Sequence, residues 1–157
     1  MIHFRIISVG KAKEAWIETG FSHYNNLLSK YAALEDVVVK AEKVRDESKR
    51  ELVLAREEEN ICARLESDNF LIVMDAAGKQ YTSEKLAEYF NSKFNQGRSR
   101  FDLVIGSALG LSYKLKERAD LLLSLSKLTF PHELTRLILA EQLYRALSIL
   151  RGSKYHK

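Results

Sequence analysis

The run Phe70-Leu71-Ile72-Val73-Met74 constrains the fold of this chain most, because it places five apolar residues in a row. A strand with one face in water alternates apolar and polar residues, whereas a parallel strand covered on both faces is apolar throughout. Four further runs rich in β-branched or leucine side chains lie at residues 2–9, 37–39, 101–105 and 121–125. Together these runs predict the strands of a parallel-rich sheet.

Amphipathic helices are expected between these strands. Between residues 17 and 31 the apolar side chains recur at spacings of three and four, which predicts a helix with one buried face. Ser83 is expected to cap a helix whose core stripe includes Leu86 and Phe90. The segment 76–79 is expected to be a loop at the end of the apolar strand.

The segment 42–66 is highly charged and carries only a sparse apolar stripe of Leu54, Ile61 and Leu65. Charges of both signs in such a segment are typical of a solvated helix face. Strands therefore alternate with helices along the chain, which predicts an α/β fold with helices on both faces of the sheet. The whole chain, 1–157, is expected to be a single domain.

The C-terminal stretch predicts a long helix over residues 132–150, directly after Pro131, the only proline. At 100° per residue, one broad apolar face is centred on Leu139, Leu143 and Leu147. A second apolar face carries Leu134, Ile138 and Ile149. One face can serve the chain's own core and the other needs a partner, so we expect a homodimer.

Several polar groups of this stretch are candidates for function. Arg136 falls inside the apolar arc, where a guanidinium is costly unless it faces a ligand or reaches the surface. Glu141 and Arg145 are four residues apart and are expected to pair. Gly152 is the expected end of the helix. The tail beyond it carries Ser153, Lys154, Tyr155, His156 and Lys157, and its removal is expected to change stability by no more than roughly 0.5 kcal/mol.

Charge and cysteine content exclude some classes of function. The net charge of +4 and a pI near 9.1 favour an anionic partner such as RNA. Cys62 is the only cysteine and the four histidines are scattered, so no metal site is expected. No apolar run is long enough to span a bilayer, and the first residues lack the layout of a signal peptide. The expected location is the cytoplasm.

Three loops follow predicted strands, after Met74, from Gly106 and from Leu125 to Phe130. In open α/β sheets, ligands bind outside the carboxyl ends of the strands. Gly106 and Gly110 allow close approach of the backbone to a ligand, although for these two glycines taken alone a plain tight turn is the more common explanation. His132 is expected to cap or pack.

Four motifs in order resemble a known family. They are Met74-Asp75-Ala76-Ala77-Gly78-Lys79, then Ile105-Gly106-Ser107-Ala108-Leu109-Gly110-Leu111-Ser112, then Leu128-Thr129-Phe130-Pro131-His132 with Leu139-Ala140-Glu141-Gln142-Leu143-Tyr144-Arg145-Ala146, and finally Tyr155-His156-Lys157. This series is similar to that of the small SPOUT methyltransferases that act on a pseudouridine of bacterial 23S ribosomal RNA. The resemblance covers essentially the whole chain.

Two positions depart from the family pattern. The family usually reads Gly-Gly-Pro-Glu-Gly where this chain has Gly106-Ser107-Ala108-Leu109-Gly110, so a glycine, a proline and a carboxylate are replaced. The usual proline before the terminal Tyr-His is Lys154 here. The first departure removes any role that the carboxylate has in the family, and the second loosens the tail.

The resemblance implies a deep trefoil knot and transfer of a methyl group from S-adenosylmethionine to N3 of a pseudouridine in 23S rRNA within the ribosome. It implies a composite site, in which the tail of one subunit reaches the cofactor pocket of the other. The implied cofactor-binding residues are Met74, Gly106, Gly110, Leu125, Ser126, Lys127, Leu128, Thr129 and Phe130. His156, Tyr155 and Arg136 are the expected catalytic residues, and the expected RNA contacts are Arg145, Lys154 and Lys157.

Two other functions fit the sequence. A knot-fold protein that binds RNA or the ribosome without catalysis would explain the lost carboxylate at Leu109. A generic nucleotide-binding α/β protein would explain the strand-end loops. Binding of S-adenosylmethionine distinguishes the methyltransferase from both.

Overall fold

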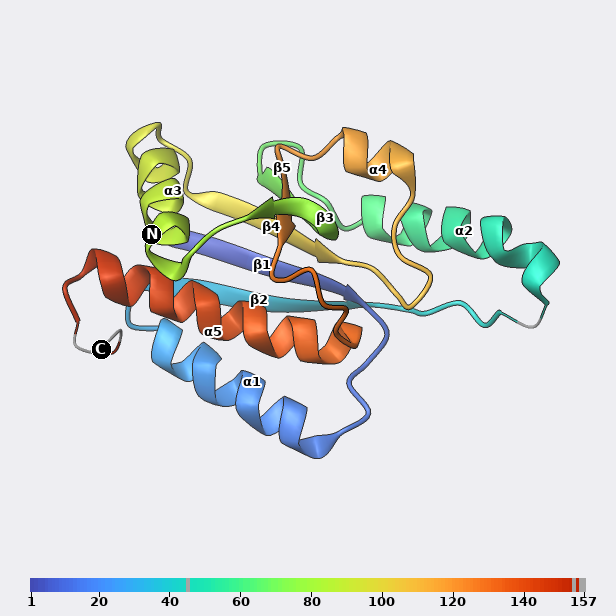
Figure 1. The fold of residues 1–157 in the computed structure, drawn as a ribbon, viewed down its shortest axis with the longest axis horizontal. Helices are drawn as coiled ribbons and strands as arrows, with labels where there is room; N and C mark the ends of the chain where they lie inside the picture. The colour runs from blue at the N-terminus through green and yellow to red at the C-terminus, as the bar shows by residue number, and fades with distance from the viewer. Residues whose placement is uncertain (45, 154, 156–157) are drawn as a thin grey trace.

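The five strands in the described part of the chain belong to one parallel sheet. The computed structural model describes residues 1–44, 46–153 and 155. The strands are β1 (Ile2–Val9), β2 (Ala32–Val39), β3 (Phe70–Gln80), β4 (Arg100–Ile105) and β5 (Leu121–Ser124). Their order is β2-β1-β4-β3-β5, and every neighbouring pair is parallel (Figure 1). The predicted α/β class is confirmed.

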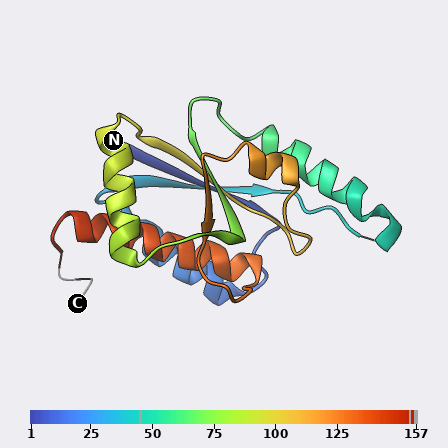
Figure 2. The same ribbon diagram turned by 45° about the horizontal axis from the view of Figure 1, so that its top comes forward.

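Helices cover both faces of this sheet. They are α1 (Ala15–Leu28), α2 (Arg50–Cys62), α3 (Ser83–Asn95), α4 (Tyr113–Glu117) and α5 (His132–Leu150), with a short 3-10 helix η1 (Glu47–Lys49) before α2. On one face α5 packs against α1 and α3, and α1 runs alongside it (Figure 1). On the other face lie α2 and α4 (Figure 2). None of the helices in the described ranges is long and apolar enough to cross a membrane.

The uninterrupted apolar run of β3 serves two cores. Phe70 and Ile72 belong to the cluster under α1, α3 and α5. Leu71 and Val73 belong to the cluster under α2 and α4. Successive side chains of a strand point to opposite faces. The run is therefore apolar at every position because both faces of the strand are covered, as the sequence predicted.

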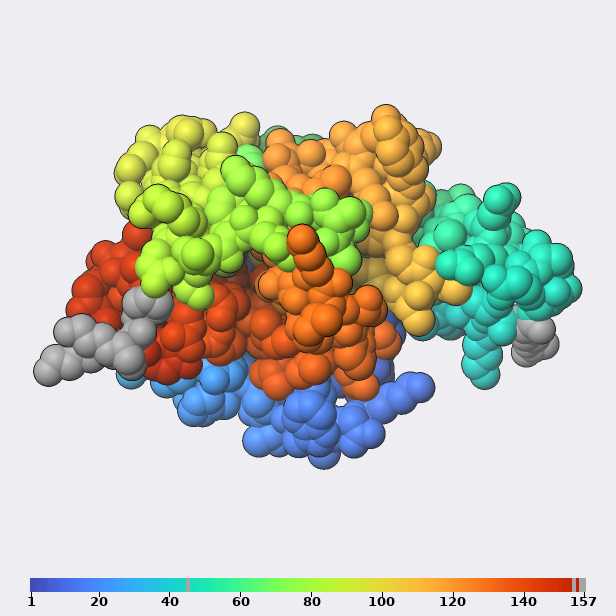
Figure 3. All heavy atoms as spheres, viewed as in Figure 1, coloured from blue at the N-terminus to red at the C-terminus, as the bar shows by residue number. Residues whose placement is uncertain are grey.

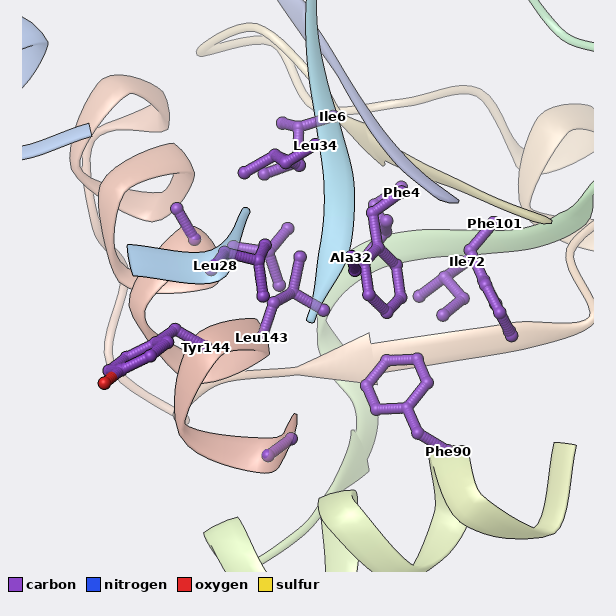
Figure 4. Packing of buried hydrophobic residues seen from close by; sticks show 14 of the residues in the cluster. Phe4, Ile6, Leu28, Ala32, Leu34, Ile72, Phe90, Phe101, Leu143 and Tyr144 are labelled. Carbon is purple, nitrogen blue, oxygen red and sulfur yellow. The ribbon is translucent and has the colours of Figure 1, made fainter. Parts of the chain in front are cut away.

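The larger core is rich in aromatic rings. Phe90 of α3 meets Phe4 of β1 with ring centroids 5.5 Å apart and Phe101 of β4 at 5.6 Å, both edge to face. Figure 4 shows these rings beside Ile72, with Leu143 of α5 on the other side of the cluster. Such edge-to-face pairs add to the burial of apolar area. This packing attaches α3 and α5 to the centre of the sheet.

The end of β3 differs from the prediction. Residues 76–79, expected as a loop, continue the strand, which pairs with β5 again at Lys79 and Gln80 after a shift of register that begins at Met74. At Gly78 a Cβ would lie 2.7 Å from the backbone of Leu122. Only glycine allows the two strands to come this close. The bend of β3 at this register shift therefore depends on a backbone contact that the periodicity of the sequence does not reveal.

Other boundaries also differ. Strand β2 begins at Ala32, five residues before the predicted start at residue 37. The prediction started late because Glu35 and Asp36, at exposed positions of the strand, interrupt the apolar pattern. Thr82 caps α3 by accepting a hydrogen bond from the backbone N–H of Lys85, so the prediction for Ser83 was wrong. Ser83 lies inside the helix and donates to Gln142 Oε1 at 2.8 Å.

Helix α5 has the predicted bounds. Gly152 ends it with φ of +67°, and the backbone N–H of Ser153 donates to the carbonyl of Ser148 at 2.9 Å. The predicted core residues Leu139, Leu143 and Leu147 are buried. Leu134, Ile138 and Ile149 are half-buried in the single chain and keep accessible apolar surface. The homodimer stays a prediction.

The C-terminal third is consistent with the trefoil knot that the resemblance implies. Strand β5 lies at the sheet edge beside β3, although β4 precedes it in the chain. The chain then returns under the sheet, where α5 contacts α1 and α3 (Figure 1). The segments on either side of β5 therefore lie close to the ends of β3 and β4.

Candidate functional site

A cavity of about 630 Å³ lies where the segments after β4 and β5 meet the bend of β3 and the start of α5. Figure 3 shows these parts of the chain meeting on one face, with the green end of β3 beside the orange segment that follows β5. Its lining residues are Met74, Asp75, Ala76, Ile105, Gly106, Ser107, Ala108, Gly110, Leu111, Lys116, Leu123, Leu125, Ser126, Leu128, Thr129, Phe130, Pro131, His132 and Thr135.

Most of the residues predicted to bind a cofactor lie together in this cavity. Eight of the nine line it, namely Met74, Gly106, Gly110, Leu125, Ser126, Leu128, Thr129 and Phe130. Lys127 is exposed and is not among the lining residues. The strand-end loops converge because parallel strands end at the same edge of a sheet.

The loop from Gly106 to Gly110 is tightly closed. The backbone N–H of Gly110 donates to the carbonyl of Ser107 at 2.9 Å, and Gly110 has φ of +80°. A Cβ at Gly106 would lie 2.7 Å from Leu111 Cγ and 2.8 Å from the carbonyl oxygen of Gly110. The expected reason for Gly106 was close approach to a ligand. In the structure, the constraint comes from the loop itself.

A buried carboxylate stands behind this loop. Glu57 of α2 is only 3% exposed, and its Oε2 accepts a hydrogen bond of 2.7 Å from Ser107 Oγ. Its Oε1 accepts from the backbone N–H of Glu42 at 3.3 Å. The predicted stripe of α2 named Leu54 and Leu65 and missed Glu57. The helical spacing could have indicated its burial, because Val53, Glu57 and Ile61 follow one another at intervals of four residues and share one face of the helix.

An ion pair joins two walls of the cavity. Lys116 Nζ of α4 lies 2.9 Å from Asp75 Oδ2 of β3. The hydrogen bond from Lys116, assisted by the backbone N–H of Ala77, lowers the pKa of Asp75 below its usual value. Asp75 is therefore ionised at neutral pH. The Oγ of Ser112 accepts a hydrogen bond from the backbone N–H of Leu115 and caps the start of this helix.

His132, expected to cap or pack, lies in the wall of the cavity. It is the first residue of α5 and lines the cavity beside Pro131 and Thr135. Its Nε2 faces Gly10, where a Cβ would lie 3.6 Å away. No spacing in the sequence distinguishes this histidine from a capping residue.

Arg136 does not line the cavity, and its contacts account for its burial. Its guanidinium pairs with Glu18 Oε1 at 2.9 Å and with the carboxylate of Asp36, and it lies 4.1 Å above the ring of Phe21. Burial lowers the pKa of Arg136, but hydrogen bonds with Glu18 and Asp36 outweigh this and raise it. The guanidinium thus faces two carboxylates of its own chain and not a ligand, so its contacts do not support the expected catalytic role.

Tyr155, in contrast, packs against the end of α5. Its ring meets Tyr144 edge to face with centroids 4.6 Å apart, and its hydroxyl donates to Glu141 Oε1 at 3.3 Å. Arg145 pairs with Glu141 at 2.5 Å, as predicted, and its guanidinium lies 4.9 Å from the centre of the Tyr155 ring. Burial, with a hydrogen bond involving Tyr24, raises the pKa of Tyr155, so its phenol is neutral at physiological pH.

These contacts place Tyr155 at the end of α5 that lies away from the cavity of the same chain. Helix α5 has 19 residues, which is roughly 28 Å at the usual rise per residue. His132 at its start lines the cavity, whereas Tyr155 lies beyond its end. His156, Lys154 and Lys157 lie outside the described residues. Within the described ranges, no group of three potential ligands could hold a metal ion.

Comparison with known proteins identifies the family. A family model described as a predicted SPOUT methyltransferase matches residues 2–156. A protein of Natranaerobius thermophilus named ribosomal RNA large subunit methyltransferase H is 42% identical over 156 residues, which cover 98% of each chain. A protein of the same name from Shouchella clausii is 41% identical over 159 residues, covering 99% of this chain and 100% of the relative.

Solved structures share the fold at low sequence identity. A probable methylase family protein from Haemophilus influenzae Rd KW20 matches with a TM-score of 0.54 and 14% identity over 99% of this chain and 70% of the other. A probable methyltransferase from Bordetella pertussis Tohama I gives a TM-score of 0.54 and 13% identity over 93% of this chain and 96% of the other. The fold, the family model and the full-length relatives agree: the chain belongs to the SPOUT methyltransferase family.

Proposed function

We propose that this protein transfers a methyl group from S-adenosylmethionine to N3 of a pseudouridine in 23S rRNA of the large ribosomal subunit. The observation that carries the proposal is the cavity formed by the three segments that match the family motifs. Full-length relatives named ribosomal RNA large subunit methyltransferase H support the same substrate class. Because ribosomes are cytoplasmic, we place the protein in the cytoplasm.

The cavity fits the cofactor in size and in chemistry. Its volume of about 630 Å³ lies within the range of sites for ligands of this size. Leu125, Leu128 and Phe130 would enclose the adenine, and the backbone between Gly106 and Gly110 would approach the ligand. The ion pair of Asp75 and Lys116 places polar atoms on the cavity wall. When bound, S-adenosylmethionine supplies an activated methyl group on a positively charged sulfur.

The residues of the chain then have to position the acceptor and remove one proton. Positioning supplies most of the rate when a reaction needs only aligned atoms. The ring nitrogen of the base must lose its proton, and a nearby base favours this step. We assign this role to His156, with Tyr155 as a surface on which the extruded base stacks. Lys154 and Lys157 would contact RNA phosphates.

A homodimer would bring these parts together. Tyr155 and the cavity of one chain lie at opposite ends of α5, so we infer that the tail acts in the cavity of another copy. Antiparallel packing of two α5 helices through Leu134 and Ile138 would place the tail of one chain near the cavity of the other. Their half-buried side chains supply apolar surface for that contact.

The contacts of Arg145 modify its expected role. Its side chain is 26% exposed, and its guanidinium pairs with Glu141 and lies over the Tyr155 ring. In this geometry Arg145 holds Tyr155 in place, and its exposed edge is available to a phosphate. Arg136 has no part in the proposed chemistry, because its charge is compensated by Glu18 and Asp36.

Two measurements test the proposal. Calorimetric titration should show binding of S-adenosylmethionine, and 23S rRNA in ribosomes that lack the modification should gain one methyl group. Mass spectrometry of rRNA fragments then identifies the nucleotide. Binding of S-adenosylmethionine without methyl transfer would instead support the RNA-binding protein without catalysis, and absence of binding at millimolar cofactor would refute the proposal.

A further inference from the structure

The buried carboxylate of Glu57 is not explained by a surface role of α2. An ionised carboxylate removed from water is costly unless it is hydrogen-bonded. Glu57 is 3% exposed and accepts two hydrogen bonds, one from Ser107 Oγ and one from the backbone N–H of Glu42. One partner belongs to the connection between β2 and α2, and the other lines the cavity.

Ser107 links Glu57 to the backbone of the 106–110 loop by hydrogen bonds. Its Oγ donates to Glu57 and accepts from the backbone N–H of Leu109 at 3.3 Å. Its carbonyl accepts from the N–H of Gly110 at 2.9 Å. The loop is therefore held by a hydroxyl at a position where the family usually has glycine, and this hydroxyl is oriented by a buried acceptor.

We propose that Glu57 is a positioning residue for the cofactor site, which acts through Ser107 to hold the 106–110 loop in the shape that binds S-adenosylmethionine. The contact of Glu57 with the N–H of Glu42 fixes the carboxylate from its other side. A loop held in its bound conformation before binding loses less conformational freedom when the ligand arrives. The part of this inference that concerns the cofactor rests on the proposed function.

Three variants separate this role from general packing. Ser107→Ala removes the hydroxyl and leaves the helix intact. Glu57→Ala removes both acceptors, whereas Glu57→Gln keeps one carbonyl oxygen and one of the two contacts. Glu59→Ala is the matched control, because Glu59 is an exposed carboxylate on the same helix.

The first readout is amide hydrogen exchange of the protein without ligand. In Ser107→Ala and Glu57→Ala, the Leu109 and Gly110 amides should exchange faster than in wild type, while amides of β1 and β4 keep their protection. Glu59→Ala should match wild type. Unchanged exchange at Leu109 and Gly110, or faster exchange throughout the sheet, would overturn the positioning role.

The second readout is cofactor affinity. Ser107→Ala and Glu57→Ala should bind S-adenosylmethionine about 10- to 100-fold more weakly, the scale of a lost hydrogen bond to a charged group, with a smaller loss in Glu57→Gln. KM for the cofactor should rise while kcat on ribosomes changes only a few-fold. Wild-type affinity in Ser107→Ala would contradict the inference. If wild type itself does not bind the cofactor, the proposed function fails, and hydrogen exchange still decides whether Glu57 holds the loop.

Discussion

Replacing Arg136 by methionine should destabilise the fold without removing methyl transfer. The side chain is 4% exposed, whereas its partners Asp36 and Glu18 are 25% and 51% exposed. Removing one partner of a fully buried pair costs about 3–5 kcal/mol. Because both carboxylates regain water here, we expect about 2 kcal/mol, including the lost contact with Phe21. For a chain of this size that lowers Tm by about 4–8 °C.

Thermal and urea denaturation of Arg136→Met, Asp36→Asn and the double variant measures the coupling between the two charges. Arg56→Met, at an exposed position on α2, is the control and should change stability by no more than about 0.5 kcal/mol. Methyl transfer per folded molecule should stay within a few-fold of wild type. A variant with unchanged Tm and activity reduced by tenfold or more would refute this reasoning and restore the catalytic role for Arg136.

Three further outcomes follow from the site. Deleting residues 153–157 should lower the free energy of unfolding by about 1–2 kcal/mol, more than the sequence suggested, because Tyr155 packs on Tyr144 and donates a hydrogen bond to Glu141. Urea denaturation measures this loss. Turnover on ribosomes should fall about a hundredfold. Lys116→Met should lower stability at pH 7 by up to about 1 kcal/mol, since its partner Asp75 is partly buried. Because the pKa of Asp75 is lowered in the fold, this difference should disappear as pH falls below about 4, and urea denaturation across pH checks it. Gly106→Val should abolish S-adenosylmethionine binding and cost about 1–3 kcal/mol of stability, because the new side chain forces the loop open. Retained affinity measured by calorimetry would show that the loop is only a turn.

The sequence predicted those parts of the fold that depend on local pattern. The apolar run of β3 and the bounds of α5 follow from periodicity and from turn chemistry that acts within a few residues. The continuation of β3 to Gln80 could not be predicted in this way. It depends on the approach of Gly78 to the backbone of β5, more than forty residues later.

The same division applies to the site. Loops at strand ends converge by topology, so eight predicted residues line the cavity. Glu57 was missed because a charged residue on a charged helix is typical of solvent exposure, and its partner Ser107 lies fifty positions away. Arg136 was placed correctly inside the apolar arc. Its two acidic partners come from α1 and β2, and no local pattern in the sequence predicts these long-range pairs.

The most direct test of a shared methyl-transfer site uses mixed dimers. A chain that ends at Gly152 keeps its cavity and lacks the tail, and Gly106→Val keeps the tail and loses the cavity. Co-expression with two different tags allows purification of dimers that contain one chain of each kind. These dimers hold one complete site, so they should transfer methyl groups to ribosomes at about half the wild-type rate, while each parent is nearly inactive. Mixed dimers as inactive as their parents would contradict a site built from the cavity of one chain and the tail of another.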